Sequence, residues 1–525
     1  MRQGIPRFRG NTVRPALLVA IVSLAAVLAT RLPARSEQLF SWDSVNFALG
    51  MERIDLDRHQ PHPPGYFGYV VAARALRFGG TENTALVRVN IVAAAASLFV
   101  LWWFALRVTR SRQAAAVAWT ITLTSPLHWF YTSVAEVYVV EASVTLMIAA
   151  AAYGCLQRGE DRTSPWLLGA AVAVAAFCKL PAAVLMAPLV AYVVVRTTGR
   201  TRLATIAAIA AGALIALAAI VSLAPLESVW RLSGSQFEGV GRSSFLGGFR
   251  ARALGRTARD IVYAGIAAVG AGGLAALLLR RPFAAGRPAL VLAIWSVPYL
   301  AMCLFVHFAK PGYALPLLPP LALWFAAGFS AVSRSRTLLA LGLIAALTTA
   351  QFALATPWSR EEAGGRRRYA DKTFAEKART ELNSILRPSL YAIRENDSLV
   401  RWFVESTSIA CGGLEAAVLV STEPPISWRQ AMFYLPDSTV VQVPGPRTGW
   451  LIAKHRRIED ATSGDLQVRA RCTVLTGEQF EKPGLPGLDS RESGEFVRHS
   501  HTMLWTRGEF TMRSERDGRV LRVRP

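Results

Sequence analysis

Long runs of apolar residues recur along the first two-thirds of this 525-residue chain, and they limit what it can fold into. Most runs have roughly 18–24 residues with almost no charge, the length that a helix needs to cross the hydrocarbon core of a bilayer. Hydrophobic residues make up 52% of the sequence, and the mean hydropathy of +0.32 is above that of an ordinary soluble protein. The sequence therefore predicts a polytopic α-helical membrane protein with about eleven transmembrane helices.

The arginines between the apolar runs predict the topology. The pair of runs on either side of Pro181 is long for one span and short for two. We take the first span to run outward from the arginine-rich N-terminus, so that every second connection is cytoplasmic. These cytoplasmic connections carry the arginines only if residues 179–181 form a turn between two separate spans. The positive-inside rule then predicts a cytoplasmic N-terminus and an extracytoplasmic C-terminus. The expected spans are 15–32, 84–106, 114–129, 139–156, 166–177, 182–195, 203–223, 260–279, 289–305, 313–331 and 338–355.

The formal net charge of +23 bears on the partners of the chain. In a soluble protein such a charge suggests nucleic acid. Here the arginines adjoin apolar runs, so we interpret them as topology signals and as contacts with anionic membrane lipid, and we expect no nucleic-acid partner. We expect a multi-pass protein of the cytoplasmic (inner) membrane.

The sequence becomes polar after Pro357, which predicts two domains: a transmembrane domain over 1–356 and a soluble extracytoplasmic α/β domain over 357–525. Residues 417–421 and 439–443 read as strands that flank a helix over 428–434, a βαβ-like pattern. Cys411 and Cys472 lie in this domain. They can pair if it faces an oxidising compartment, and the sequence leaves open whether they do. Further strands are expected over 449–454, 471–476 and 502–506.

The segment between the first two long spans, residues 33–83, is too long for a tight connection and is expected on the outer side. Residues 42–51 are typical of a short amphipathic helix, and Asp43 stands at its head. His62 then opens the sequence HPPGY, whose prolines and glycine end one element. Residues 66–78 are apolar enough for a second helix in the membrane interface.

An acid at the head of a loop helix, followed about twenty residues later by HPPGY, resembles the first outer loop of the GT-C glycosyltransferases. The pattern is most similar to the glycosyltransferase family 39-like proteins, which include protein O-mannosyltransferases and lipid A aminoarabinose transferases. Residues 125–142 (SPLHWFYTSVAEVYVVEA), Arg88, and residues 307–320 (HFAKPGYALPLLPP) resemble later segments of these proteins, so that the resemblance covers roughly the first two-thirds of the chain.

The resemblance implies a GT-C-like fold and a transfer reaction on the outer face of the membrane. The donor is a polyprenyl-phosphate-linked sugar, and the acceptor is a hydroxyl of a glycan, lipid or protein. The resemblance also implies that Asp43 is the general base, since a hydroxyl is a weak nucleophile that needs a carboxylate nearby. The alternative is that Asp43 only caps its helix. Glu136, in the second outer loop, is the expected second acid or substrate ligand.

The remaining candidates are substrate ligands. Cations at the outer ends of spans suit the phosphate of the carrier, although contact with lipid headgroups is the ordinary alternative. An acid at membrane depth, such as Glu141, is expected to be functional. The expected substrate-binding residues are His62, Arg88, Glu141, Lys179, His307, Lys310 and Tyr313. Arg242 and Arg250 are alternative phosphate ligands, and the glycine-rich stretch 239–248 is a candidate lid.

A metal site is an alternative for the acidic part of the first outer loop. Carboxylates and imidazoles are suitable ligands for a divalent cation. A solvated loop, neutralised by its own arginines, is the competing interpretation. Ser44 stands where many relatives of the family carry a second acid, which weakens the case for a paired-carboxylate or metal site. No other cofactor is expected. The residues concerned are Glu52, Asp55, Asp57, His59 and His62.

Two other functions fit a polytopic chain. A transporter or flippase of lipid-linked sugars has a similar number of spans, but internal symmetry or paired broken helices are expected of it, and the sequence has neither. A non-catalytic assembly or sensor protein leaves Asp43 and HPPGY without a role. Substitution of Asp43 distinguishes both from the enzyme.

Overall fold

The computed structural model divides by packing into two compact units. The helical unit consists of Met1–Arg35 and Pro63–Ile393, and the sheet unit of Ser36–His62 and Arg394–Pro525. This division differs from a single boundary at residue 356, because Ser36–His62 packs with C-terminal residues. The structure describes residues 13–157, 163–243, 251–280, 287–359, 362–363, 371–420, 426–443, 450–462, 464–477, 493–498, 501–513 and 519–525.

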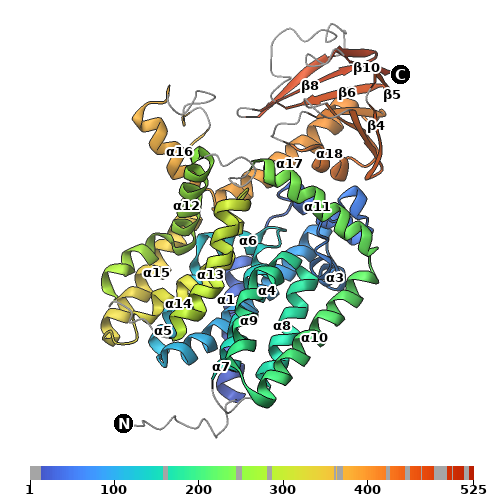
Figure 1. Cartoon of the computed structure of the whole chain (residues 1–525). Helices are drawn as coiled ribbons and strands as arrows, with labels where there is room; N and C mark the ends of the chain where they lie inside the picture. The colour runs from blue at the N-terminus through green and yellow to red at the C-terminus, as the bar shows by residue number, and fades with distance from the viewer. Residues whose placement is uncertain are drawn as a thin grey trace, which may run out of the picture. The chain divides into compact units, whose positions relative to one another are not determined.

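The helical unit is a bundle (Figure 1). Short 3₁₀ or π-helical segments interrupt it at η2 (Leu277–Leu279), η3 (Met302–Val306) and η4 (Pro311–Leu317). Its α-helices are α1 (Val13–Arg31), α3 (Phe67–Ala75), α4 (Glu82–Thr109), α5 (Arg112–Thr124), α6 (Pro126–Ser133), α7 (Tyr138–Leu156), α8 (Ser164–Cys178), α9 (Leu180–Arg196), α10 (Gly199–Val221), α11 (Leu226–Ser243), α12 (Ala251–Ala276), α13 (Arg287–Ala301), α14 (Leu318–Ala327), α15 (Arg334–Leu354) and α16 (Phe374–Leu386).

Seven helical segments in the described part of the chain are long and apolar enough to cross a membrane. They lie in α1, α4, α7, α10, α12, α13 and α15. The apolar helices α8 and α9 are shorter. They separate at Lys179, whose backbone is extended, so the two runs around Pro181 form two helices as predicted. The chain is thus a polytopic helical membrane protein.

Four of the expected spans are not continuous α-helices, and that part of the prediction is wrong. Span 260–279 contains the non-helical Gly270, and span 289–305 ends in the π-helical η3. The other two spans break near prolines. Residues 114–129 divide between α5 and α6, because Ser125 caps α6 and Pro126 begins it. Residues 313–331 begin as the 3₁₀ segment η4 and become α-helical only at Leu318. Proline lacks the N–H that a continuing α-helix needs, and prolines recur at both breaks.

Small residues bring α8 and α10 into close contact (Figure 1). A β-carbon at Gly169 would lie 2.2 Å from the carbonyl oxygen of Ala208, and one at Gly212 would lie 2.2 Å from the carbonyl oxygen of Gly169. Backbone oxygens cannot move away as a side chain can, so only glycine fits at these positions. Close approach through small residues is the usual way in which helices pack inside a membrane.

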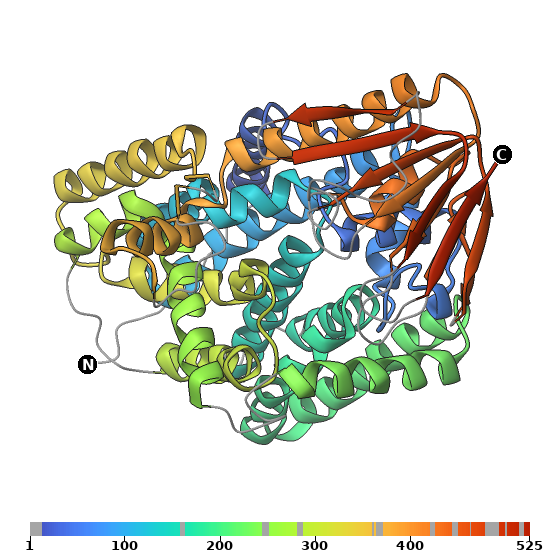
Figure 2. The ribbon, with the colours of Figure 1, turned by 90° about the horizontal axis from the view of Figure 1, so that it is seen from above.

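The sheet unit combines three α-helices with two sheets. The seven-stranded sheet has the order β4-β3-β2-β1-β6-β8-β7, and the three-stranded sheet has the order β5-β10-β9. Figure 2 shows the strands from above. The helices are α2 (Trp42–Glu52), α17 (Leu390–Cys411, in this unit from Arg394) and α18 (Trp428–Tyr434). The strands are β1 (Ala416–Val420), β2 (Thr439–Gln442), β3 (Trp450–Lys454), β4 (Arg457–Thr462), β5 (Leu466–Arg469), β6 (Cys472–Thr476), β7 (Ser493–Arg498), β8 (His501–Arg507), β9 (Phe510–Arg513) and β10 (Val520–Arg524).

The centre of the seven-stranded sheet is parallel. Strand β1 pairs in parallel with β2, so β1, α18 and β2 form the predicted βαβ unit. Every residue of β1 is buried, as expected of a strand that is covered on both faces. The five strands expected in this region correspond to β1, β2, β3, β6 and β8.

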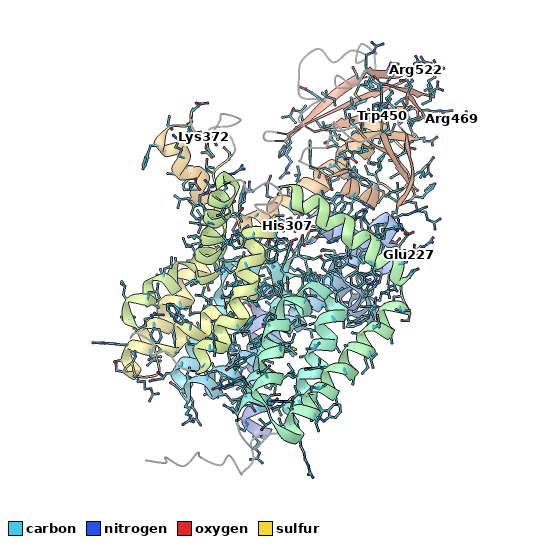
Figure 3. All side chains as sticks on the ribbon, viewed as in Figure 1. Glu227, His307, Lys372, Trp450, Arg469 and Arg522 are labelled. Carbon is cyan, nitrogen blue, oxygen red and sulfur yellow. A yellow bond between two sulfur atoms is a disulfide. The ribbon has the colours of Figure 1, made fainter. Side chains whose placement is uncertain are left out.

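The core of the sheet unit lies between its two sheets. Trp450 of β3 is fully buried there, together with apolar residues of both sheets such as Leu419 and Leu521. Figure 3 labels Trp450 among the strands, and Arg469 and Arg522 on exposed positions of β5 and β10. A disulfide between Cys411 and Cys472 joins the end of α17 to β6.

Candidate functional site

Asp43 lies in the first turn of α2 in the sheet unit, and it is not the helix cap. Ser41 is the N-cap: its Oγ accepts a hydrogen bond from the Ser44 N–H, and Ser44 Oγ accepts one from the Ser41 N–H. The capping alternative for Asp43 is therefore wrong. A carboxylate in the first turn of a helix also faces the positive end of the helix dipole.

His62 of the HPPGY sequence lies beside Asp43. Its Nδ1 is 3.7 Å from Asp43 Oδ1, and the two side chains are 13% and 20% exposed. The His62 ring also contacts Phe47, with 5.4 Å between ring centroids. The sequence predicted both residues separately, and the fold brings them together. A partly exposed carboxylate next to an imidazole is a chemically competent proton acceptor for a hydroxyl group.

Gly50 lets the segment before His62 pass close to α2, so that His62 can lie beside Asp43. A β-carbon on Gly50 would lie 2.9 Å from both the N and the Cδ of Pro61. The backbone nitrogen of Pro61 cannot rotate away, so a side chain at residue 50 would displace the segment that carries His62. Glycine at this position of α2 is thus a requirement of the Asp43–His62 arrangement.

In the helical unit, Glu136 is buried between α6 and α7 and pairs with Lys310. Lys310 Nζ lies 3.1 Å from Glu136 Oε1, and the lysine side chain is 32% exposed against 2% for the glutamate. Asn90 of α4 holds the connection that carries Glu136. Its Nδ2 donates to the carbonyl oxygens of Tyr131, Val134 and Glu136 at 3.3, 2.7 and 2.8 Å. Asn90 therefore fixes the backbone that carries this acid.

Glu141 and Lys179 form a second, deeper ion pair. Glu141 Oε1 also accepts a hydrogen bond of 3.3 Å from the Tyr299 hydroxyl. Lys179 Nζ lies 4.7 and 5.3 Å from the ring centroids of Tyr138 and Tyr313, within the range of cation–π attraction. Glu141 and Lys179, both predicted as substrate ligands, are thus paired with each other. Glu136 precedes α7, whereas Glu141 lies in its first turn, so the two acids use separate lysines.

Aromatic residues connect these pairs. Tyr138 contacts both Tyr131 and Tyr313, with ring centroids 5.0 and 5.2 Å away, and the ring of His307 meets Tyr313 edge-on at 5.0 Å. The Gly312 N–H donates a 3.0 Å hydrogen bond to the Tyr131 hydroxyl. Figure 3 labels His307, which directly follows η3. Six predicted residues therefore gather in one cluster of the helical unit: Glu136, Glu141, Lys179, His307, Lys310 and Tyr313.

Arg88 has a different environment. Its Nη1 donates to the carbonyl oxygens of Leu76 and Phe78 at 2.9 and 2.6 Å, and its guanidinium lies over the Phe78 ring. These contacts hold the turn after α3. A role for Arg88 in substrate binding stays a prediction. Arg250, the side chain of Arg242 and part of the stretch 239–248 lie outside the described residues.

The acids of residues 52–57 have partners other than a metal. Glu52 pairs with Arg456, and Asp55 caps η1 (Leu56–Arg58) by accepting from the Arg58 N–H. No group of three His, Cys, Asp or Glu side chains suited to a metal ion occurs in the part of the chain that the structure describes.

Sequence reasoning missed Asn90 and Tyr299 in the helical unit, and Arg429 and Asp397 in the sheet unit. A signal for Asn90 existed, because an amide inside an apolar span needs polar partners. Arg429 and Asp397 lie hundreds of residues from the loop that they contact, so the sequence held no local signal for them.

Comparison with known proteins agrees with this picture. Residues 61–224 match the sequence model of the family described as dolichyl-phosphate-mannose-protein mannosyltransferase. The fold is similar to that of ArnT from Cupriavidus metallidurans in the apo state, with a TM-score of 0.55 and 15% identity over 94% of this chain and 98% of that chain. ArnT from the same organism bound to undecaprenyl phosphate matches with a TM-score of 0.55, 14% identity and the same coverage. A comparison with curated protein sequences finds no match.

Residues 61–224 are thus similar in sequence to a glycosyltransferase family, and 94% of the chain is similar in fold to ArnT. The predicted resemblance to the family 39-like group is confirmed over residues 61–224 by sequence, and the fold expected of that group extends over 94% of the chain.

Proposed function

We propose that this protein transfers a sugar from a polyprenyl-phosphate donor to an acceptor hydroxyl on the outer face of the cytoplasmic membrane. The observation that carries the proposal is the partly exposed carboxylate of Asp43, which lies beside His62 in a helix whose N-cap is Ser41. The undecaprenyl phosphate bound to the structurally similar ArnT supports a polyprenyl carrier.

In the proposed reaction the acceptor oxygen attacks the anomeric carbon of the donor sugar. Asp43 takes the hydroxyl proton as the new carbon–oxygen bond forms, which a positioned general base accelerates by about 10²–10⁴-fold. The bond between the anomeric carbon and the phosphate oxygen breaks, and the polyprenyl phosphate leaves with the electron pair. A leaving phosphate is stabilised by cations and hydrogen-bond donors. The predicted candidates for this role are Lys310 and His307 of the helical unit, and Lys310 is the more exposed of the two lysines in the helical cluster.

The proposed orientation places the N-terminus in the cytoplasm and the sheet unit outside it. The disulfide between Cys411 and Cys472 supports this orientation, because disulfides persist in oxidising compartments and are rare in the cytosol. The regular placement of arginines between the apolar runs supports the same topology.

The test is a transfer assay in membranes with a panel of labelled polyprenyl-phosphate sugars. Wild type is compared with Asp43→Asn, which keeps the size of the side chain and removes the base, and with Asp57→Asn, the same change at an exposed position of the same loop. We expect Asp43→Asn to lower transfer about a hundredfold or more, and Asp57→Asn to leave it near the wild-type rate.

The other outcomes are equally informative. Equal transfer by wild type and Asp43→Asn refutes Asp43 as the base and makes Glu136 the next candidate. If wild type transfers no sugar of the panel but purified protein moves lipid-linked sugar across vesicles, the transporter replaces the enzyme.

A further inference from the structure

The strand-rich C-terminal part of the chain holds the start of the segment that carries Asp43. Asp397 of α17 is 1% exposed and accepts three hydrogen bonds from this segment. Its Oδ1 accepts from Ser36 Oγ at 2.7 Å and from the Gln38 N–H at 2.9 Å, and its Oδ2 accepts from the Glu37 N–H at 2.9 Å. One buried carboxylate thus binds three consecutive residues just before α2, and all four residues belong to the sheet unit.

Helix α18 binds the next part of this segment, at Leu39, shortly before α2. The Tyr434 hydroxyl accepts a 2.6 Å hydrogen bond from the Leu39 N–H, and Gln430 Nε2 donates a 3.1 Å hydrogen bond to the Leu39 carbonyl oxygen. Both polar groups of the Leu39 backbone are therefore satisfied by α18. Because Leu39 lies only a few residues before Asp43, the entry to α2 has little freedom to move.

Arg429 of α18 contacts both the first residue of α2 and the segment that follows this helix. Its Nη2 donates a 2.7 Å hydrogen bond to the carbonyl oxygen of Arg58, and its guanidinium carbon lies 5.4 and 4.5 Å from the ring centroids of Trp42 and Trp428. Trp42 directly precedes Asp43, and Arg58 lies shortly before His62. A single side chain therefore contacts the neighbourhoods of both members of the Asp43–His62 pair.

The surroundings of Arg429 argue for a dedicated role. The residue is 1% exposed, and in the described part of the chain it has no carboxylate partner. Its Nε and Nη1 are buried without a hydrogen-bond partner in that same part. Desolvation lowers the pKa of Arg429 to about 9. Such burial is costly for a cation, and a hydrophobic residue would fill this place at less cost unless the contacts with Trp42 and Arg58 are needed.

We propose that Asp397 and Arg429 are positioning residues for the proposed transferase reaction, and that through them the C-terminal sheets and helices orient Asp43 and His62. The inference rests on the proposed function, and it assigns to the C-terminal region a part in catalysis. Neither residue touches the reacting atoms. Each acts through the segment Ser36–His62, by fixing where α2 begins and where His62 returns to it.

The experiment has two independent measurements on the full-length protein in detergent. The first is hydrogen exchange by mass spectrometry on peptides that cover residues 36–52 and on peptides from β1 and β6. Asp397→Asn and Arg429→Met are compared with Glu415→Gln, which removes a partly exposed ion pair with Lys454 elsewhere in the same unit. We expect about tenfold faster exchange in residues 36–52 for the first two variants, unchanged strands, and no change in Glu415→Gln.

The second measurement is the kinetics of transfer. We expect Asp397→Asn and Arg429→Met to lower kcat about tenfold with little change in the KM for the donor, and tenfold corresponds to about 1.4 kcal/mol of transition-state stabilisation. In an Asp43→Asn background the same substitutions should have no further effect on the rate, because a positioning residue acts only through the base that it orients. A substitution that only destabilises the protein would lower the transfer rate by the same factor in the wild-type and the Asp43→Asn backgrounds.

Each outcome is decisive. Unchanged exchange in residues 36–52, equal acceleration in the strands, or additive losses with Asp43→Asn would overturn the positioning role. If no donor is transferred by wild type while exchange of residues 36–52 rises in the two variants alone, the loop is held as proposed and only the proposed function fails.

Discussion

Removing one partner of the Glu141–Lys179 pair should destabilise the protein far more than removing both. The two side chains are 2% and 4% exposed, so neither charge has access to water. Breaking a buried pair by removal of one member leaves an uncompensated charge and costs about 3–5 kcal/mol, whereas replacement of both members by neutral groups of similar size is often close to neutral. For Lys179→Met we therefore expect a loss of about 3–5 kcal/mol in the free energy of unfolding.

The remaining contacts of the pair refine this magnitude. Lys179→Met also loses the attraction to the Tyr138 and Tyr313 rings, which is worth about 0.5–2 kcal/mol at each ring. Glu141→Gln keeps an oxygen that accepts from the Tyr299 hydroxyl. The double variant Glu141→Gln/Lys179→Met should therefore recover more than half of the loss of the single lysine variant.

The assay is equilibrium unfolding of purified protein in a denaturing detergent, followed by tryptophan fluorescence, for wild type, both single variants and the double variant. Wild-type stability of Lys179→Met would refute the reasoning, because the charge of Glu141 would then be satisfied without the lysine. Transfer by the double variant separates two roles of Lys179. Retained transfer shows a structural ion pair only, and a stable but inactive double variant supports the predicted binding of the carrier phosphate.

Three further predictions concern single positions. Gly312→Ala puts a β-carbon 2.4 Å from a carbon of a neighbouring tyrosine ring; we expect overpacking to cost about 1–3 kcal/mol in the same unfolding assay. Gly50→Ala forces the backbone of Pro61 away, so transfer should fall by at least tenfold while the unfolding of the helical bundle is unchanged; undiminished transfer contradicts the proposed arrangement. Burial and the nearby Arg429 lower the pKa of His59 below its ordinary 6.5. The unfolded chain then binds more protons just below pH 6.5, so the stability that neutral His59 contributes is lost as the pH falls through that range. Arg429→Met should raise the pKa of His59, measured by pH-dependent chemical modification and mass spectrometry, and an unchanged pKa would leave burial as its sole cause.

Local patterns predicted those parts of the fold that depend on local physics. Apolar runs identified most of the helices, because the need to satisfy backbone groups in lipid acts on each segment separately. The breaks at Pro126 and after Pro311 were missed, although the prolines are visible in the sequence. Apolar composition continues across both breaks, so hydropathy alone does not show where the helix stops.

Local patterns also predicted individual residues of the candidate site, but not the contacts between them. HPPGY and the acid before it predicted Asp43 and His62 as site residues, and position at the expected outer ends of spans predicted Lys179 and Lys310. That Glu141 and Lys179 neutralise each other required the packing of α7 against α9. An ion pair between residues far apart in sequence has no local pattern, because its energy depends only on their distance and burial in the folded chain.

The sequence by itself determined that the chain is a polytopic membrane protein, where most of its helices lie, and that an acid stands near the start of the helix expected after the first span. Hydrophobic length and a short motif are properties of neighbouring residues, and they persist in any fold of the chain. Only the tertiary structure decided that Ser36–His62 packs with the C-terminal strands and helices, that Ser41 is the N-cap of α2, and that Arg429 and Asp397 bind the segment around α2. Those outcomes depend on contacts between residues that lie hundreds of positions apart, and such contacts leave no local pattern in the sequence.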